Sequence, residues 1–214
     1  MSTTVFPAPP SPFPSINTQN LTKGTVLHRT HASSFGPAQF NPCKGQPTRF
    51  APFVDAAGSC VPTLYAASTR EAAAFESIFH DIEPTAPFKT VRLDVVEARS
   101  VSRIAPKRDL MLARLFAPDL KAWGLSRTQL IETPKSTYDK TVLWAEAVHR
   151  ARNDVDGLIW TSRQCDPDVC VILFGDRVAE SDFVEVERID VSADAALLLE
   201  LRNFGQRAGI TIVS

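Results

Sequence analysis

A strand and a helix meet in the segment Leu64-Tyr65-Ala66-Ala67-Ser68-Thr69-Arg70-Glu71-Ala72-Ala73-Ala74-Phe75-Glu76, and the predicted fold rests on this junction. Residues 61–67 are predicted to form a short strand. Residues 68–71 match a capping box, in which the Ser and Glu side chains each accept a hydrogen bond from the other's backbone N–H. The box predicts that a helix begins here and runs to about His80.

Two polar side chains of this segment are candidates for a functional site. Glu76 lies on the same helical face as Ala72, Phe75 and Phe79. A carboxylate on a buried face must be paired, or its pKa rises. On this observation alone, the simpler interpretation is that Glu76 lies at the edge of the apolar stripe and reaches solvent. Tyr65 could lie near the helix N-terminus, where anions are favoured, although packing is its simpler role.

Further strands and helices are predicted around this junction. Strands are expected over residues 25–30, 88–95, 157–160, 169–174, 184–191 and 210–213. Helices are expected over 108–123, broken at Pro118, over 138–152, and over 195–206 with Ser192 as the cap. The polar segment 33–59 is predicted to be a functional loop. Because strands and helices do not alternate regularly, an α+β fold is favoured over a doubly wound sheet.

The composition is that of one folded domain with a tail. The chain has 214 residues, of which 44% are hydrophobic and 22% are charged. Residues 1–22 carry no charge and hold five of the 16 prolines, so they are predicted to form an extended tail. The folded domain is therefore expected over residues 23–214.

Charge and cysteine content narrow the class of protein. With 23 Lys and Arg against 24 Asp and Glu, the chain lacks the basic excess of a general nucleic-acid binder. No apolar run reaches the ~20 residues of a membrane span, and residues 1–20 do not resemble a signal peptide. Free thiols are expected, with no metal site, because the cysteines are few and scattered, and the expected location is cytoplasmic. The four cysteines are Cys43, Cys60, Cys165 and Cys170.

Three arginines and a serine are further candidates. Arg29 lies within an apolar strand and Arg49 within the long loop, and a guanidinium suits phosphates and carboxylates. A surface ion pair is the simpler interpretation for each arginine. The apolar run 157–160 leads into Ser162 and Arg163, which are expected at a sheet edge, or simply where the strand enters a turn.

These motifs together resemble the RES domain family over residues 24–191. The resemblance rests on the order and spacing of five motifs and on the helix over 138–149. The motifs are Leu27-His28-Arg29, Arg49-Phe50-Ala51-Pro52, Leu64-Tyr65-Ala66 with Glu76 eleven residues after the tyrosine, Asp156-Gly157-Leu158-Ile159-Trp160-Thr161-Ser162-Arg163, and Val171-Ile172-Leu173-Phe174. The chain departs from the family pattern in its longer segment over 55–60, in Thr48 and in the proline-rich tail.

The resemblance implies an α+β, ADP-ribosyltransferase-like fold with a split β-sheet, flanking helices and a cleft for NAD. Family members degrade NAD by phosphorolysis or hydrolysis, and some transfer ADP-ribose to a protein. Many are toxins held inactive by an Xre-type antitoxin. The implied substrates are therefore NAD and, for phosphorolysis, inorganic phosphate, and the implied partner is an antitoxin that could form an oligomer with this chain.

The resemblance also implies roles for individual residues. Glu76 would stabilise the oxocarbenium ion formed when nicotinamide leaves, and Tyr65 would stack on nicotinamide. Arg29 and Arg49 would hold the pyrophosphate or an attacking phosphate. Ser162 would hydrogen-bond the ribose or the amide, while Arg163 would assist or brace its loop. Protein ADP-ribosyl transfer and a catalytically silent binding module on the same fold are the alternatives.

Overall fold

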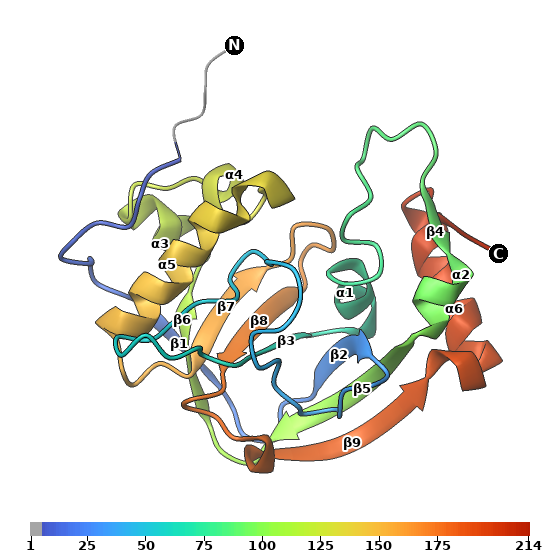
Figure 1. Cartoon of the computed structure of the whole chain (residues 1–214), viewed down its shortest axis with the longest axis horizontal. Coiled ribbons are helices and arrows are strands. Elements are labelled where there is room, and N and C mark those ends of the chain that lie inside the picture. Colours follow the sequence, from blue (N-terminus) through green and yellow to red (C-terminus); the bar gives the residue numbers. More distant parts are fainter. Residues whose placement is uncertain (1–5) are drawn as a thin grey trace.

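A computed structural model describes residues 6–214 of the chain (Figure 1). The strands are β1 (Thr18–Leu21), β2 (Leu27–Ala32), β3 (Thr63–Ala67), β4 (Thr90–Arg92), β5 (Arg99–Pro106), β6 (Leu110–Arg114), β7 (Gly157–Thr161), β8 (Val169–Phe174), β9 (Phe183–Asp190) and β10 (Thr211–Val213). The α-helices are α1 (Arg70–Phe75), α2 (Leu93–Glu97), α3 (Ala117–Ala122), α4 (Arg127–Leu130), α5 (Tyr138–Ala151) and α6 (Ala195–Arg207). Short 3-10 helices are η1 (Lys135–Thr137), η2 (Glu180–Asp182) and η3 (Val191–Ala193).

Eight of these strands form one curled sheet, so the expected α+β class is confirmed. The strand order is β1-β6-β7-β8-β3-β2-β5-β9, while β4 and β10 form a separate parallel pair. The sheet was expected to be split. The eight strands form one sheet, and the shortest strand pairing in it is that between β2 and β3. There β2 and β3 share the register pair His28 with Ala67, whereas β3 and β8 are paired from Thr63 to Ala67. The two strands are therefore free to part beyond His28.

Apolar side chains form three clusters around the sheet. The curled sheet encloses one cluster, to which β2, β3, β5, β6, β7 and β8 all contribute. A second cluster packs β7 and β8 against α3, α4 and α5, and a third lies beneath α1, α2 and α6 (Figure 1). Successive residues of β7 and β8 enter different clusters, because neighbouring side chains in a strand point to opposite faces. Both faces of these strands are buried, which explains their continuous apolar sequences.

The segment predicted as an extended tail (1–22) contacts the folded domain. Its first five residues lie outside the described part of the structure. Phe13 packs edge-on against Trp123 and Trp144, with ring centroids 5.0 and 5.9 Å away. Residues 18–21 form β1, which pairs antiparallel with β6 at one edge of the sheet. The prolines of this segment lie before β1, where no neighbouring strand needs a hydrogen bond from the N–H group that proline lacks.

The junction helix differs from prediction at both ends. Its N-cap is Thr69, whose hydroxyl accepts from the Ala72 N–H at 3.1 Å. The predicted cap, Ser68, instead donates to Asp168 at 2.9 Å and accepts from the Val169 N–H at 3.1 Å. The cap lies one residue later than predicted, and the predicted capping box is wrong, because Ala72 at N3 has no side-chain acceptor. The helix ends at Phe75 rather than near His80, and turns follow it.

Two other predictions were wrong because strand and helix patterns overlap in short segments. Only residues 90–92 of the predicted strand 88–95 are extended, and α2 follows them. The predicted helix 108–123 is β6 followed by α3, and Pro118 lies in the first turn of α3, where its missing N–H costs nothing. The strand β5 was not predicted.

Several predicted elements are confirmed with small shifts of their ends. The first predicted strand, over 25–30, is β2, and that over 61–67 is β3. The strands predicted over 157–160, 169–174, 184–191 and 210–213 are β7, β8, β9 and β10. The helices predicted over 138–152 and 195–206 are α5 and α6, although Asp194 rather than Ser192 caps α6.

The prediction that all four cysteines are free thiols is wrong. Cys43 and Cys60 form a disulfide, while Cys165 and Cys170 are free. The bond joins the two halves of the long loop that precedes β3. Sequence spacing could not reveal this pair, because the loop has to fold before the two sulfur atoms meet. The expectation of a cytoplasmic location rested partly on free thiols and stays a prediction.

Candidate functional site

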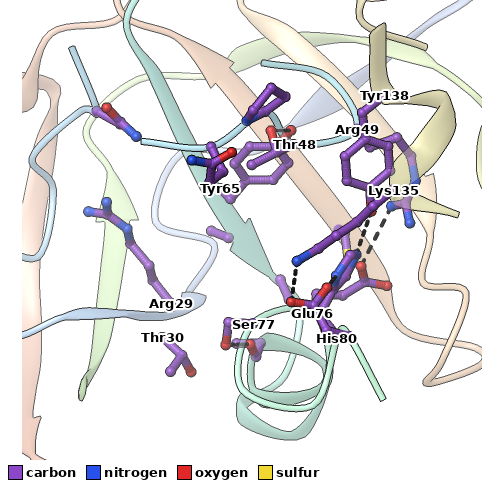
Figure 2. A pocket seen from close by; sticks show the side chains of 18 of the residues that line it. Arg29, Thr30, Thr48, Arg49, Tyr65, Glu76, Ser77, His80, Lys135 and Tyr138 are labelled. Carbon is purple, nitrogen blue, oxygen red and sulfur yellow. Dashed lines mark hydrogen bonds and ion pairs between the residues drawn. The ribbon is translucent and has the colours of Figure 1, made fainter. Parts of the chain in front are cut away.

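A pocket of about 370 Å³ opens where β2 and β3 part. This volume lies within the ~300–1,000 Å³ typical of small-molecule sites. Arg29 and Thr30 of β2 and Tyr65 of β3 line it, together with the loop before β3 and the turn after α1. Figure 2 shows Glu76, His80 and Lys135 together on one side, Arg29 on the other, and Tyr65 between them.

Glu76 lies at the C-cap of α1, and its carboxylate is held from three sides. Ser162 Oγ donates to Glu76 Oε1 at 2.7 Å, and the Arg163 backbone N–H donates to the same oxygen at 3.2 Å. Arg49 Nη1 lies 3.7 Å from Oε2. The side chain is 14% exposed and lines the pocket. The simpler interpretation, a carboxylate at the edge of the stripe and in solvent, is therefore wrong.

Arg49 is the most deeply buried cation of the pocket, with its side chain 3% exposed. Its guanidinium carbon lies 5.9 Å from the centroid of the Tyr138 ring. Its Nε and Nη2 atoms are buried and have no hydrogen-bond acceptor among residues 6–214. Unpaired buried donors are costly, so these two N–H groups favour an anionic ligand in the pocket.

Tyr65 fastens the loop to the sheet. Its hydroxyl oxygen accepts from the Phe50 backbone N–H at 3.1 Å and is hydrogen-bonded to Thr48 Oγ1 at 2.9 Å. Burial raises the pKa of Tyr65 to about 12, so the phenol is neutral at physiological pH. The ring forms part of the pocket wall, and its hydroxyl positions the backbone on either side of Arg49.

Arg29 is buried on β2, on the side of the pocket away from Glu76 (Figure 2). Its Nη1 donates to the backbone oxygens of Gly36 and Pro37 at 3.1 and 2.8 Å. Burial lowers the pKa of Arg29 to about 10, and the charge of Glu180 opposes that effect. The guanidinium therefore remains charged at neutral pH.

Ser162 and Arg163 lie behind the pocket wall. Ser162 is fully buried, and its hydroxyl oxygen also accepts from the backbone N–H groups of Gln164 and Cys165 at 3.2 and 3.1 Å. The Arg163 guanidinium donates to the backbone oxygens of Thr133 and His80 at 2.8 and 3.4 Å. Both residues hold the loop after β7 against Glu76.

Sequence reasoning missed a second group of polar residues in the same pocket. His80 Nε2 is hydrogen-bonded to the Tyr138 hydroxyl at 3.0 Å, and His80 Nδ1 to Asp81 Oδ1 at 2.9 Å. Lys135 forms an ion pair with Asp81. The adjacent His80-Asp81 pair was the available signal, but nothing in the sequence connects it to a tyrosine 58 residues away.

The arrangement combines one fixed carboxylate with several cations. Arg29, Arg49, Arg99 and Lys135 line the pocket beside Glu76 and Asp81. Such a pocket suits a ligand with negative groups at one end and a developing positive charge near the carboxylate. Among the described residues, no cluster of three or more His, Cys, Asp or Glu side chains could hold a metal ion.

Residues 26–194 match the family model of the RES domain, so the chain belongs to the RES domain family. The fold is similar to that of MbcT in the crystal structure of the M. tuberculosis MbcT–MbcA toxin–antitoxin complex. The TM-score is 0.60 at 16% sequence identity, and the match covers 86% of this chain and 92% of that chain. No curated protein matches the sequence. The family resemblance noted from the motifs is thereby confirmed.

The part of the chain that the structure describes contains no helix long and apolar enough to cross a membrane.

Proposed function

We propose that this protein cleaves the bond between nicotinamide and ribose in NAD, by phosphorolysis or by hydrolysis. The α+β fold would then be ADP-ribosyltransferase-like, with the pocket between β2 and β3 as the NAD cleft. The observation that carries the proposal is the position of Glu76. Three separate groups fix its carboxylate on the wall of a pocket that is otherwise rich in cations.

The reaction breaks the C–N bond, and its electron pair leaves with the nicotinamide nitrogen. The ribose ring then carries positive charge as an oxocarbenium ion. The Glu76 carboxylate stabilises that charge and accepts a hydrogen bond from a ribose hydroxyl. Because Glu76 is already oriented in the free protein, little reorganisation is needed in the transition state. A phosphate or water oxygen then forms the new bond to the ribose carbon.

Two arginines and Tyr65 bind the other parts of the substrate. Arg49 binds the pyrophosphate or an attacking inorganic phosphate through its free N–H groups. Arg29 binds the phosphates from the other side of the pocket, and the Tyr65 ring stacks on nicotinamide.

Ser162 and Arg163 act through Glu76 in this proposal. The one proton of the Ser162 hydroxyl is donated to Glu76, and its oxygen accepts from two backbone N–H groups. No capacity is left for a direct hydrogen bond to NAD. Ser162 is therefore a positioning residue, and the Arg163 guanidinium braces the loop.

We also propose that the protein is the toxin of a toxin–antitoxin pair. The fold it shares with MbcT and its membership of the RES family support this proposal. The partner would be an Xre-type antitoxin that covers the pocket.

The proposal is tested by NAD consumption with purified protein, with and without phosphate, with the products identified by mass spectrometry. We expect Glu76→Gln to keep the fold and lose nearly all activity, because the amide cannot neutralise the oxocarbenium ion. Glu71→Gln is the matched control on the same helix, since Glu71 pairs with Arg207 and does not line the pocket. The control should retain full activity.

The products distinguish the alternatives. A phosphorylated ADP-ribose formed only with phosphate indicates phosphorolysis, and free ADP-ribose indicates hydrolysis. ADP-ribose attached to lysate protein indicates transfer to a protein. Intact NAD in every tube, with no toxicity on induced expression, would favour a silent binding module. Normal turnover by Glu76→Gln would contradict the assignment of this site.

A further inference from the structure

The pocket contains a hydrogen-bonded chain that the mechanism above does not use. It runs from the Tyr138 hydroxyl to His80 Nε2, and from His80 Nδ1 to Asp81 Oδ1, with distances of 3.0 and 2.9 Å. Lys135 pairs with the other carboxylate oxygen, Oδ2, and so orients Asp81. The members come from the turn after α1, from η1 and from the start of α5, and all four line the pocket.

The partners of His80 determine its tautomer. An ionised carboxylate can only accept, so Nδ1 carries the proton that it donates to Asp81. Nε2 of the neutral ring then presents a lone pair to the Tyr138 hydroxyl, which donates to it. This is the arrangement in which a carboxylate orients a histidine so that its far nitrogen can accept a proton from a hydroxyl.

Charged groups on every neighbouring element act on His80. Burial is the largest effect and lowers the pKa of His80 below 6.5, while the hydrogen bond to Asp81 raises it. Arg49 from the loop and Arg163 from the turn after β7 lower the pKa further, and Glu76 raises it. Lys135 and its hydrogen bond with Asp81 help to hold the pKa of that carboxyl below its ordinary value, although burial alone would raise it. At neutral pH the ring is therefore uncharged and able to accept a proton.

Tyr138 lies next to the groups proposed to act on the substrate. The Arg49 guanidinium, which approaches the Tyr138 ring, also lies 3.7 Å from the Glu76 carboxylate. Tyr138 and Glu76 line the same pocket, so the attacking water would occupy the space between the Tyr138 hydroxyl and the ribose held by Glu76.

We propose that Tyr138, His80 and Asp81 form a proton relay that activates water for hydrolysis of NAD, and that attack by phosphate does not need this relay. The inference rests on the proposed function. Water loses a proton to the Tyr138 oxygen, and the Tyr138 proton passes to His80 Nε2. The oxygen electron pair of water forms the bond to the ribose carbon of the oxocarbenium ion, after the C–N electron pair has left with nicotinamide. His80 then releases the proton to solvent. Phosphate already carries negative charge on its attacking oxygen, so no base is required.

The test compares hydrolysis and phosphorolysis in His80→Gln and Tyr138→Phe. General-base catalysis contributes about 10²–10⁴-fold, so hydrolysis without phosphate should fall at least ~10²-fold in both variants. Phosphorolysis should keep its order of magnitude. The phenylalanine keeps the ring beneath Arg49 and removes only the hydroxyl. His149→Gln is the matched control, because it removes a similar His–Asp pair, with Asp176 at 2.9 Å, outside the pocket.

The pH profile gives a second readout that a merely structural role would not change. In the wild type, kcat/KM for hydrolysis should fall as the pH drops through the pKa of His80, below 6.5, because an imidazolium cannot accept a proton. The acidic limb should be absent in His80→Gln.

Each remaining outcome counts against the relay. Equal losses of hydrolysis and phosphorolysis, or unchanged hydrolysis in either variant, would show that the chain is structural. A wild type that consumes NAD only with phosphate would overturn the relay and leave the proposed function intact. A wild type that consumes no NAD would instead overturn the proposed function.

Discussion

Glu76 is a carboxylate at a position where the helical pattern predicts an apolar side chain, and the structure gives the physical reason. Helical spacing placed it on an apolar face, where a carboxylate is unfavourable. The helix ends at Phe75, so Glu76 occupies the C-cap. Its side chain accepts hydrogen bonds from the Ser162 hydroxyl and the Arg163 N–H. The Ser77 hydroxyl bonds the Ala73 backbone oxygen at 2.6 Å, and the chain continues as turns. The conflict in the sequence therefore has a structural cause, which is that the carboxylate is paired at the end of the helix.

Ser162→Ala tests the positioning role at the residue scale. The substitution removes one of the two hydrogen bonds to Glu76 Oε1 and leaves the Gln164 and Cys165 backbone N–H groups without their acceptor. We expect kcat for NAD cleavage to fall on the order of 10²-fold while KM changes little, because Ser162 does not touch the substrate. Steady-state kinetics measure both constants.

Ser100→Ala is the matched control, since Ser100 is also fully buried but bonds Asp190 away from the pocket. Its kcat should match that of the wild type. A raised KM with unchanged kcat in Ser162→Ala would show instead that the hydroxyl binds NAD directly.

At the scale of elements, the long loop before β3 forms one wall of the pocket. Its segment 46–49 lines the pocket and lies inside the ring closed by the Cys43–Cys60 disulfide. Tyr65 ties the same segment to β3 through Thr48 and Phe50. The position of Arg49 therefore depends on a covalent link and on the two hydrogen bonds of the Tyr65 hydroxyl.

Cys60→Ser should lower both stability and activity. The disulfide spans 17 residues, and closing a loop of about this length stabilises a protein by roughly 3 kcal/mol. We expect a lower free energy of unfolding in urea and a higher KM for NAD, because the wall that carries Arg49 becomes less ordered.

A reducing agent should produce the same changes in the wild type. The Cys43→Ser/Cys60→Ser double variant should be insensitive to reductant. Identical urea unfolding of oxidised and reduced wild type would contradict the structural role of this bond.

At the scale of the whole molecule, the N-terminal segment before β1 contacts residues more than 100 positions away in the chain. Trp144 Nε1 donates to the Pro7 oxygen at 3.1 Å, and Trp123 Nε1 donates to the Ser15 oxygen at 3.0 Å. Phe13 packs edge-on against both indole rings, which stack on each other. The N-terminal segment thus crosses α3 and α5 before it enters the sheet as β1.

Phe13→Ala should destabilise the protein by about 1–3 kcal/mol, because a partly buried ring and two aromatic contacts are lost. Thermal unfolding and tryptophan fluorescence measure the effect, and the emission should shift to longer wavelength as water reaches Trp123 and Trp144. Phe88→Ala is the control, since Phe88 is 84% exposed. Equal unfolding temperatures for the two variants would show that the N-terminal segment does not stabilise the fold.

Much of the fold was predictable where the pattern is local and long. The runs over β7 and β8 are apolar because both faces are buried, and α5 and α6 repeat their apolar positions over several turns. The motifs that place Arg49, Tyr65, Glu76 and Ser162 in order along the chain determined the family, which the family model confirms.

Only the tertiary structure decided the remaining features, because they depend on groups distant in the sequence. The Ser68 hydroxyl accepts from the Val169 N–H, 101 residues away, and Thr69 caps the helix instead, while strand pairing turned 110–114 into β6. Tyr138 meets His80 across 58 residues. Local propensity reports only on near neighbours, whereas these contacts exist only once the sheet has curled and its loops have packed. The sequence by itself therefore determined the family and singled out candidate residues, and the tertiary structure decided which of them line one pocket and which groups they contact.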